Sequence, residues 1–184
     1  MTDEQIVDMY CDRNELAIAY TSQKYGAYCH TVAYGILHNE EDSQESVNDT
    51  YMSAWSSIPP HRPDILKTFL GKITRRLSID RWRKKNAGKR SGETAEVLDE
   101  LSECASGSGD PIAESEKSLL DMTVNTFIRE LKDTERKVFV CRYWYAEPVA
   151  DIAKRFGFSE SKVKVMLMRT RNKLKERLET EGLL

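Results

Sequence analysis

The first 85 residues carry apolar side chains at the spacing of helix faces, and no stretch alternates as a half-buried strand does. The pattern is interrupted by a polar turn at 38–41 and again at 58–64, where Pro59, Pro60 and Pro63 exclude a continuous helix. We therefore predict a helical domain over residues 1–88. Its apolar positions include Ile6, Met9, Tyr10, Leu16, Ile18, Tyr20, Tyr25, Tyr28, Val32, Ile36 and Leu37.

The composition changes after this domain. Residues 86–116 are rich in Gly, Ser and acidic side chains and contain the run SGSGDP at 106–111. A segment of this kind buries too little apolar surface to fold by itself. We predict a flexible acidic linker over 89–117, with one short helical piece around Val97 to Leu101. A second helical domain is predicted over 118–184, so the fold class is all-α with two small domains.

The second domain carries clear signals for where its helices begin and end. A helix is predicted at about 135–144, and the next is expected to have Pro148 at its first position, where the missing N–H is not needed. Gly157 suits a left-handed C-cap, and Ser159 suits the N-cap of a third helix that reaches about residue 179. Two helices joined by so short a turn predict a helix-turn-helix, which places its second helix in the major groove of DNA.

The third helix has two different faces on a helical wheel. One face is apolar and is expected to pack on the preceding helices through Val163, Leu167, Thr170, Leu174 and Leu178. The opposite face offers side chains suited to base edges and phosphates, namely Ser161, Val165, Met168, Arg169 and Asn172, flanked by Lys164 and Lys175. Either Val165 or Met168 contacts a thymine methyl group, or both are exposed without consequence. A protein-binding helical hairpin is the alternative to DNA binding.

The net charge is only −2, from 28 basic and 30 acidic residues, but it is unevenly divided along the chain. Residues 1–60 carry −8, 61–92 carry +9, 93–130 carry −8 and 131–184 carry +5. Two basic blocks separated by acidic ones indicate two surfaces that bind a polyanion. The acidic blocks either meet another partner or keep the chain soluble.

Composition excludes several other classes of protein. No apolar run approaches the roughly 18 residues that cross a bilayer, and the first residues are acidic, unlike a secretory signal, so a cytoplasmic location is expected. The four cysteines are far apart and form no CxxC pair, so we interpret them as reduced thiols. His30 and His38 share a helix face, but with no third ligand nearby no metal site is expected.

Two helices of the first domain are charged on one side. On the helix at about 41–57, acidic residues lie opposite the apolar face: Asp42, Glu45 and Asp49, beside Asn48, Met52 and Ser53. A solvated surface is the usual explanation of such a stripe, and a docking surface for a basic partner is the alternative.

The next helix, LKTFLGKITRRLSIDRWRKK, is expected to expose a basic side on which Ile79 and Trp82 also lie. An aromatic ring among cations suits single-stranded nucleic acid, because an unstacked base can stack on the ring while the cations follow the phosphates. Packing of Trp82 on a neighbouring helix is the alternative. The cations expected on this side are Lys72, Arg75, Arg83 and Lys85.

In this order, these segments resemble the bacterial sigma factors of RNA polymerase, specifically the short, two-domain extracytoplasmic-function type. The resemblance is carried by EEDSQESVNDTYMSAW and TFLGKITRRLSIDRWRKK in the first domain, and by DTERKVFVCRYWYAEPVADIAKRFGFSESKVKVMLMRTRNKLKERL in the second. It implies a protein that binds core RNA polymerase and promoter DNA and opens the DNA in a regulated or stress response. It also implies an anti-sigma factor as a further partner. The residues themselves show no nucleophile with its base, no glycine loop that cradles a phosphate and no metal cluster, so no catalysis and no cofactor are expected.

The resemblance implies a role for each surface by position. The acidic helix matches the one that docks on the clamp helices of the polymerase's largest subunit, through Asp42, Glu45, Asn48, Asp49 and Met52. The basic helix matches the segment that reads and melts the minus-ten element, through Lys72, Arg75, Arg76, Ile79, Trp82 and Arg83. The loop at 57–63 matches the one near the captured non-template base, and the linker matches the acidic segment threaded toward the RNA exit path.

The third helix matches the reader of the minus-thirty-five element. The residues to which this assigns DNA contacts are Ser159, Ser161, Lys162, Lys164, Val165, Met168, Arg169 and Arg171. The sequence departs from the family at Arg76, where Asn is usual, and at Met166 and Met168, where Arg and His are frequent. The promoter sequence therefore cannot be carried over from relatives. A helix-turn-helix regulator that never engages polymerase and a protein-only adaptor remain the alternative functions.

Overall fold

The computed structural model of the chain describes residues 1–86, 93–105 and 114–183, and the regular structure within these ranges is all helical. The helices form two compact units, Met1–Lys89 and Arg90–Leu184. The predicted all-α fold with two helical domains is confirmed. Each unit is described by itself.

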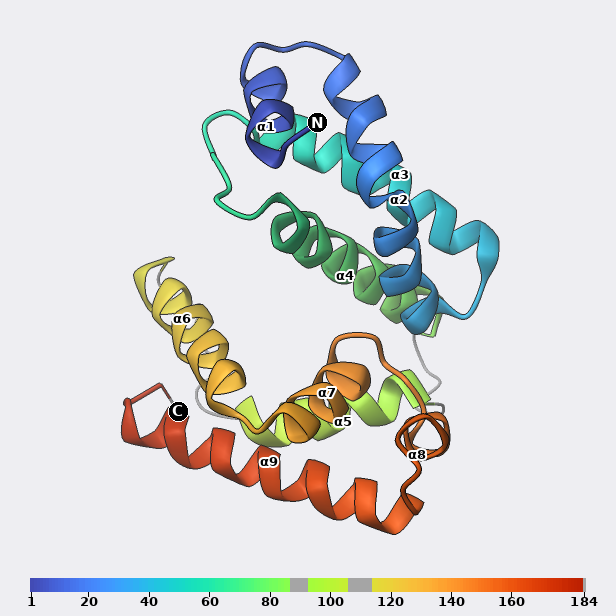
Figure 1. The fold of residues 1–184 in the computed structure, drawn as a ribbon, viewed down its shortest axis with the longest axis vertical. Coiled ribbons are helices and arrows are strands. Elements are labelled where there is room, and N and C mark those ends of the chain that lie inside the picture. The colour runs from blue at the N-terminus through green and yellow to red at the C-terminus, as the bar shows by residue number, and fades with distance from the viewer. Residues whose placement is uncertain (87–92, 106–113, 184) are drawn as a thin grey trace. The chain divides into compact units, whose positions relative to one another are not determined.

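The first unit contains α1 (Asp3–Cys11), α2 (Leu16–Leu37), α3 (Glu40–Ser57) and α4 (Leu66–Lys85). Helices α2, α3 and α4 pack on one another, and α1 packs against α2 (Figure 1). Apolar side chains from all four helices meet in one core, which includes Ile6, Tyr10, Ala17, Cys29, Ala33, Val47, Ala54, Leu66 and Leu70.

Both breaks predicted in this unit are present. His38, with φ of 49°, caps α2 in the left-handed conformation, and the Asn39 side chain then accepts the N–H of Asp42 at 2.9 Å to begin α3. The proline-containing stretch separates α3 from α4. Local residue chemistry thus determines where these helices begin and end.

Small polar residues line the contact between α3 and α4. Ser46 and Thr50 on α3, and Thr74 and Ser78 on α4, are fully buried. The hydroxyls of Thr50 and Thr74 lie 3.0 Å apart, and the Ser78 hydroxyl donates to the backbone oxygen of Thr74 at 2.8 Å. Because these side chains are short and the hydroxyls of Thr50, Thr74 and Ser78 bond backbone oxygens of their own helices, the two helices can approach closely. The buried Ser46 hydroxyl has no hydrogen-bond partner among the described residues.

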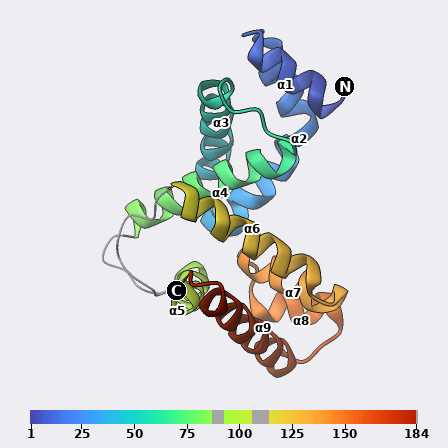
Figure 2. The same ribbon diagram turned by 90° about the vertical axis from the view of Figure 1, so that its left-hand side faces the viewer.

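The second unit contains α5 (Glu93–Ala105), α6 (Glu114–Glu130), α7 (Asp133–Tyr143), α8 (Val149–Phe156) and α9 (Glu160–Thr180). Helix α9 is the longest of these, and α5, α6, α7 and α8 all pack against it (Figure 2). Its predicted apolar face is confirmed, since Val163, Leu167, Thr170, Leu174 and Leu178 are all buried.

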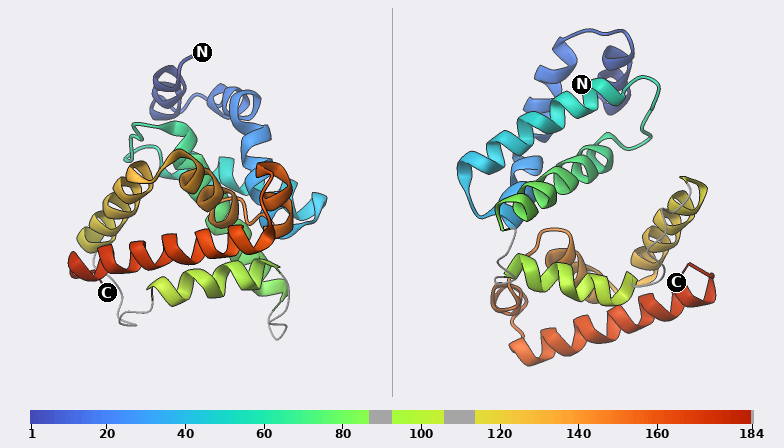
Figure 3. Two further views of the ribbon diagram at one scale, coloured as in Figure 1. Left: turned by 60° about the horizontal axis from the view of Figure 1, so that its bottom comes forward. Right: turned by 180° about the vertical axis from the view of Figure 1, so that it is seen from behind.

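The range predicted as a linker contains α5. This helix spans 13 residues, more than the short helical piece expected around Val97. It packs along α9 and against α7 (Figure 3). The rest of the segment between 87 and 113, including the SGSGDP run, lies outside the described residues.

The helix-turn-helix signals hold in the structure. Gly157 has φ of 65° and caps α8 in the left-handed conformation, as predicted. The Ser159 hydroxyl accepts the N–H of Lys162 at 3.3 Å and begins α9. Pro148 was predicted to be the first helical residue of α8. It is instead the N-cap, and the helix starts one residue later, at Val149.

Candidate functional site

The outer face of α9 is exposed along the length predicted to meet DNA. Ser161, Lys164 and Arg169 are exposed, and Val165 and Met168 leave 42% and 46% of their surfaces open to solvent. Apolar side chains so open, on a helix whose other face is buried, are free to contact a ligand. The predicted exposure of these side chains is therefore present, and their contact with DNA stays a prediction.

The N-terminal turn of α9 is braced locally. The Lys162 ammonium lies 3.6 Å from the centroid of the Phe158 ring, and the Phe156 and Phe158 rings stack with centroids 6.1 Å apart. Because the Ser159 hydroxyl acts as the N-cap, it holds the helix end in place. These contacts fix the end of the helix that a helix-turn-helix presents to base edges.

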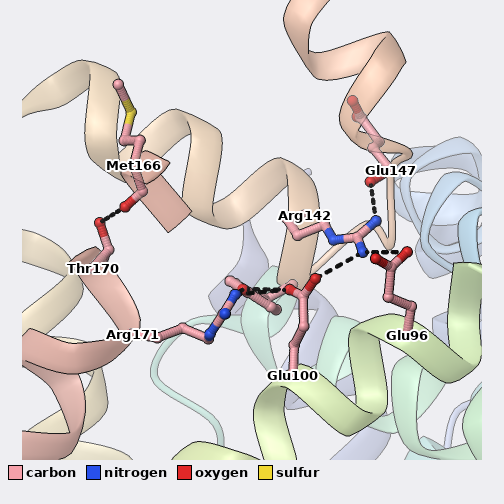
Figure 4. A network of polar contacts seen from close by, with 8 residues as sticks. Glu96, Glu100, Arg142, Glu147, Met166, Thr170 and Arg171 are labelled. Atoms are coloured by element: carbon pink, nitrogen blue, oxygen red, sulfur yellow. Dashed lines mark hydrogen bonds and ion pairs between the residues drawn. The ribbon is translucent and has the colours of Figure 1, made fainter. Parts of the chain in front are cut away.

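Arg171, predicted among the DNA contacts, points into the second unit. Its guanidinium donates to the Tyr143 hydroxyl at 2.7 Å and to Glu100 of α5 at 3.1 Å, and its side chain is only 17% exposed (Figure 4). The physical reason is that Arg171 lies beside α5 and not on the outer side of α9. It is left out of the DNA-contacting set proposed below.

Arg142 of α7 forms the centre of the same network. Its side chain is 1% exposed and bonds Glu96 and Glu100 of α5, each at 3.0 Å, and the backbone oxygen of Glu147 at 3.2 Å (Figure 4). Burial acts to lower the pKa of Arg142, but the two carboxylates outweigh it and raise that pKa. Burial and the hydrogen bond to Glu100 likewise raise the pKa of Tyr143.

Sequence reasoning missed these roles of Glu96 and Glu100. Both residues lie in the segment that was predicted to be a flexible linker with one short helical piece around Val97 to Leu101. One signal was available: Arg142 lies between the apolar neighbours of a helix that had to be buried, so it required a counter-charge. The sequence does not say which segment supplies that charge.

In the first unit, α4 presents the predicted basic side, with one correction. Lys72, Arg76 and Arg83 are exposed, and Trp82 is half-buried. Ile79 was predicted on this exposed side. It is instead 8% exposed, because it lies on the part of α4 that is buried by packing within the unit. We therefore remove Ile79 from the candidate DNA-contacting residues.

Like charges crowd on this side of α4. Arg75 is half-buried, and burial together with the nearby charge of Arg83 lowers its pKa. A polyanion placed there would relieve that repulsion. The half-buried ring of Trp82 comes seven residues after Arg75, about two helical turns, and so lies on the same side of α4. An aromatic surface and a cation therefore occur together, as the stacking hypothesis requires.

The acidic stripe of α3 is largely paired within the unit. Asp42 was predicted to be exposed and is instead 8% exposed, forming an ion pair with Lys85. Arg81 bonds both Glu45 and Asp49, the latter at 2.8 Å. These pairs form because the two helices run antiparallel, which brings the start of α3 beside the end of α4.

What α3 leaves open is a smaller, less charged patch. Met52 is 58% exposed, and Asn48 is exposed with its side-chain oxygen accepting from Gln44 at 3.3 Å. Glu45 and Asp49 remain partly exposed at the edge of this patch, with 59% and 48% of their side chains open. We call Gln44, Glu45, Asn48, Asp49 and Met52 the α3 patch.

The last turn of α3 and the loop that follows it are each tied to the N-terminal part of the unit. Arg13 donates to the backbone oxygen of Trp55 at 2.6 Å, and its guanidinium lies 5.4 Å from the centroid of that ring. In the loop, Arg62 pairs with Asp8 of α1. These contacts hold the segment between α3 and α4 against the N-terminal part of the unit.

Among the described residues, no group of three or more His, Cys, Asp and Glu side chains is arranged to hold a metal ion. Within the same ranges, no helix combines the length and apolar character that crossing a membrane requires.

A helix-turn-helix in one unit and a basic, aromatic helix in the other define a two-unit DNA-binding protein. Comparison with protein families gives two matches: Sigma-70 region 2 over residues 22–88, and Sigma-70, region 4 over residues 121–174. Together these matches cover more than half of the chain, which therefore belongs to the sigma-70 family, in the two-domain organisation of the extracytoplasmic-function type. No curated protein matches the chain.

Members of this family are DNA-binding transcription initiation factors that act with RNA polymerase in promoter recognition. The matches fall one in each unit: region 2 contains α3 and α4, and region 4 contains α7, α8 and most of α9. The helix α5 lies between them and is part of neither match.

Proposed function

We propose that the chain docks on core RNA polymerase through the α3 patch, opens the minus-ten element with α4, and reads the minus-thirty-five element with α9. The observation that carries this is the presence of two separate basic, exposed surfaces, one in each family-matched unit. A regulator that only binds DNA needs one such surface. We also propose that residues 1–88 and 118–184 act as the two functional domains.

The docking role is supported by the composition of the α3 patch. Met52 provides an exposed apolar anchor, while Asn48 and the partly exposed carboxylates of Glu45 and Asp49 surround it with polar groups. A central apolar anchor inside a polar rim is typical of protein interfaces. Asp42 is excluded from this role because it is buried against Lys85.

The two DNA-contacting sets keep the predicted residues whose side chains the structure leaves exposed or, for Arg75 and Trp82, half-buried. For the minus-ten element they are Lys72, Arg75, Arg76, Trp82 and Arg83, and for the minus-thirty-five element Ser159, Ser161, Lys162, Lys164, Val165, Met168 and Arg169. We further propose a regulated response, in which an anti-sigma factor covers one of these surfaces.

Docking is tested by measuring the affinity of the chain for purified core polymerase. Met52→Asp places a charge at the centre of the α3 patch and is expected to weaken binding at least tenfold, since truncating or charging a central anchor costs about 2 kcal/mol or more. Leu16→Asp is the matched control, because Leu16 is 56% exposed in the same unit but lies outside the patch. Equal affinities for the two variants would overturn the assignment of this surface.

A further inference from the structure

Helix α5 is an acidic helix that packs on the DNA-binding unit. It contains five acidic and no basic residues. Val97 and Ala95 are buried, at 1% and 8% exposure, where α5 packs along α9 and against α7. The helix is thus amphipathic, with an apolar side against the unit and its charges around it.

Two carboxylates of α5, those of Glu96 and Glu100, form ion pairs with two arginines of this unit. Glu100 bonds Arg142, Arg171 and Tyr143, and Glu96 bonds Arg142 (Figure 4). Carboxylates and phosphates are recognised by the same guanidinium geometry. While α5 is in place, Arg142 is covered and both arginines bond carboxylates of the same chain.

Helix α5 also lies beside the face of α9 that is proposed to read DNA. Glu96 and Glu100 line a pocket of about 350 Å³ whose other walls include Lys164, Val165 and Met168 of α9. A recognition helix in the major groove has phosphates on both sides of it. Carboxylates beside that face repel those phosphates, and more strongly at low ionic strength.

We propose that α5 is an intramolecular competitor of promoter DNA. It covers Arg142 and Arg171, sets negative charge beside the recognition face, and leaves its position when α9 enters the major groove. The inference rests on the proposed DNA-reading role of α9. Departure of α5 also exposes the two arginines, which then become additional cations for the phosphate backbone.

The opposite possibility is that α5 is a permanent part of the DNA-binding unit. The variant Val97→Asp, in the full chain, separates the two because it puts a charge into the buried contact and releases α5. It also makes the protein more acidic, so simple charge repulsion predicts weaker DNA binding. Our proposal predicts tighter binding; if α5 covers the face in about 90% of molecules, its release raises the apparent affinity about tenfold.

Binding is measured by fluorescence anisotropy, using a short duplex that the wild-type chain has enriched from a random pool. Met122→Asp is the matched control, because it adds the same charge at a position of α6 that is 64% exposed. This control is expected to bind no more tightly than wild type. Binding by Val97→Asp that is equal to or weaker than that of the control would overturn the proposal.

A second measurement uses the wild-type chain and does not depend on any variant folding. Hydrogen exchange of the amides at 94–100 is compared in the free chain and in its complex with the same duplex. We expect these amides to lose protection in the complex, while those of α9 gain it. Unchanged or increased protection of α5 in the complex would overturn the proposal.

These outcomes are distinct from failure of the proposed function. If the chain enriches no duplex and supports no transcription, the sigma role itself fails, and the competition with it. If the chain binds DNA and supports transcription while α5 stays protected, only the competition is wrong.

Discussion

Val165 and Met168 are the residues at which the sequence departs most clearly from an ordinary polar recognition face. Both are exposed, on the side of α9 away from its packing. A thymine methyl group in the major groove is the apolar feature that such side chains can recognise. The alternative, apolar exposure without consequence, makes a different prediction about the DNA.

Replacing single thymines by deoxyuracil removes only that methyl group. For the wild-type chain we expect one such substitution in the minus-thirty-five element to weaken binding severalfold, because a buried methyl group contributes about 0.8 kcal/mol. The variant Val165→Ser or its counterpart Met168→Ser is expected to become insensitive to that substitution, as measured by anisotropy titration. If the wild-type chain tolerates deoxyuracil at every position, the methyl contact does not exist.

At Trp82 the expected effect falls on DNA opening rather than on initial binding. The half-buried ring lies among the cations of α4, and stacking with an unpaired base contributes about 1–3 kcal/mol. Trp82→Ala is therefore expected to reduce open-complex formation, followed by permanganate reactivity of unpaired thymines, more than closed-complex binding. Trp82→Phe keeps a stacking surface and is expected to recover much of the loss. Equal losses in both steps would contradict a role in melting.

At the scale of the element, the contact between α3 and α4 holds the docking and melting surfaces together. Ser46 is fully buried in this contact, whereas Ser56 lies exposed on the same helix. Ser46→Leu overpacks the contact and is expected to lower the free energy of unfolding by about 1–3 kcal/mol, measured by urea denaturation. Ser56→Leu is the control and is expected to change it by less than about 0.5 kcal/mol. A similar effect of both substitutions would mean that the contact is not tightly packed.

The turn between α8 and α9 depends on one backbone conformation. Gly157 has φ of 65°, and a Cβ added there would meet no atom within 4 Å, so only the backbone opposes a larger residue. Gly157→Ala is expected to destabilise the second unit by about 1 kcal/mol and to weaken DNA binding in proportion. Lys154→Ala is the control, because Lys154 is exposed and lies within the regular helical backbone of α8. Thermal unfolding that shifts equally for both would show that the turn is not under this constraint.

Over the whole molecule, helix ends and turns could be predicted from the sequence because they depend on neighbouring residues. The burial of charged side chains by partners far along the chain could not be predicted. Gly157 and Ser159 marked the helix-turn-helix correctly because caps and turns depend on neighbouring residues. The burial of Asp42 could not be predicted, because its partner Lys85 is far along the chain and reaches it only through packing of α3 on α4. The inward position of Arg171 could not be predicted for the same reason, because its partner Glu100 lies on α5, far away in the sequence.

The four charge blocks along the sequence are also changed by pairing between distant residues in the folded chain. The acidic block of residues 1–60 and the basic block of 61–92 partly neutralise each other, since α3 and α4 exchange ion pairs through Arg81 and Lys85. The acidic block that follows contributes α5, whose Glu96 and Glu100 pair within the second unit. The basic groups left exposed on α4 and α9 remain as the two surfaces proposed to bind DNA.

The central claim is that the chain directs core polymerase to start at a specific promoter. Run-off transcription with purified core, the chain and DNA fragments from its own genome tests this most directly. We predict transcripts with one defined start per promoter, dependent on the chain and lost with Met52→Asp but not with Leu16→Asp. DNA binding without chain-dependent transcripts would contradict the account and identify a regulator that acts without polymerase.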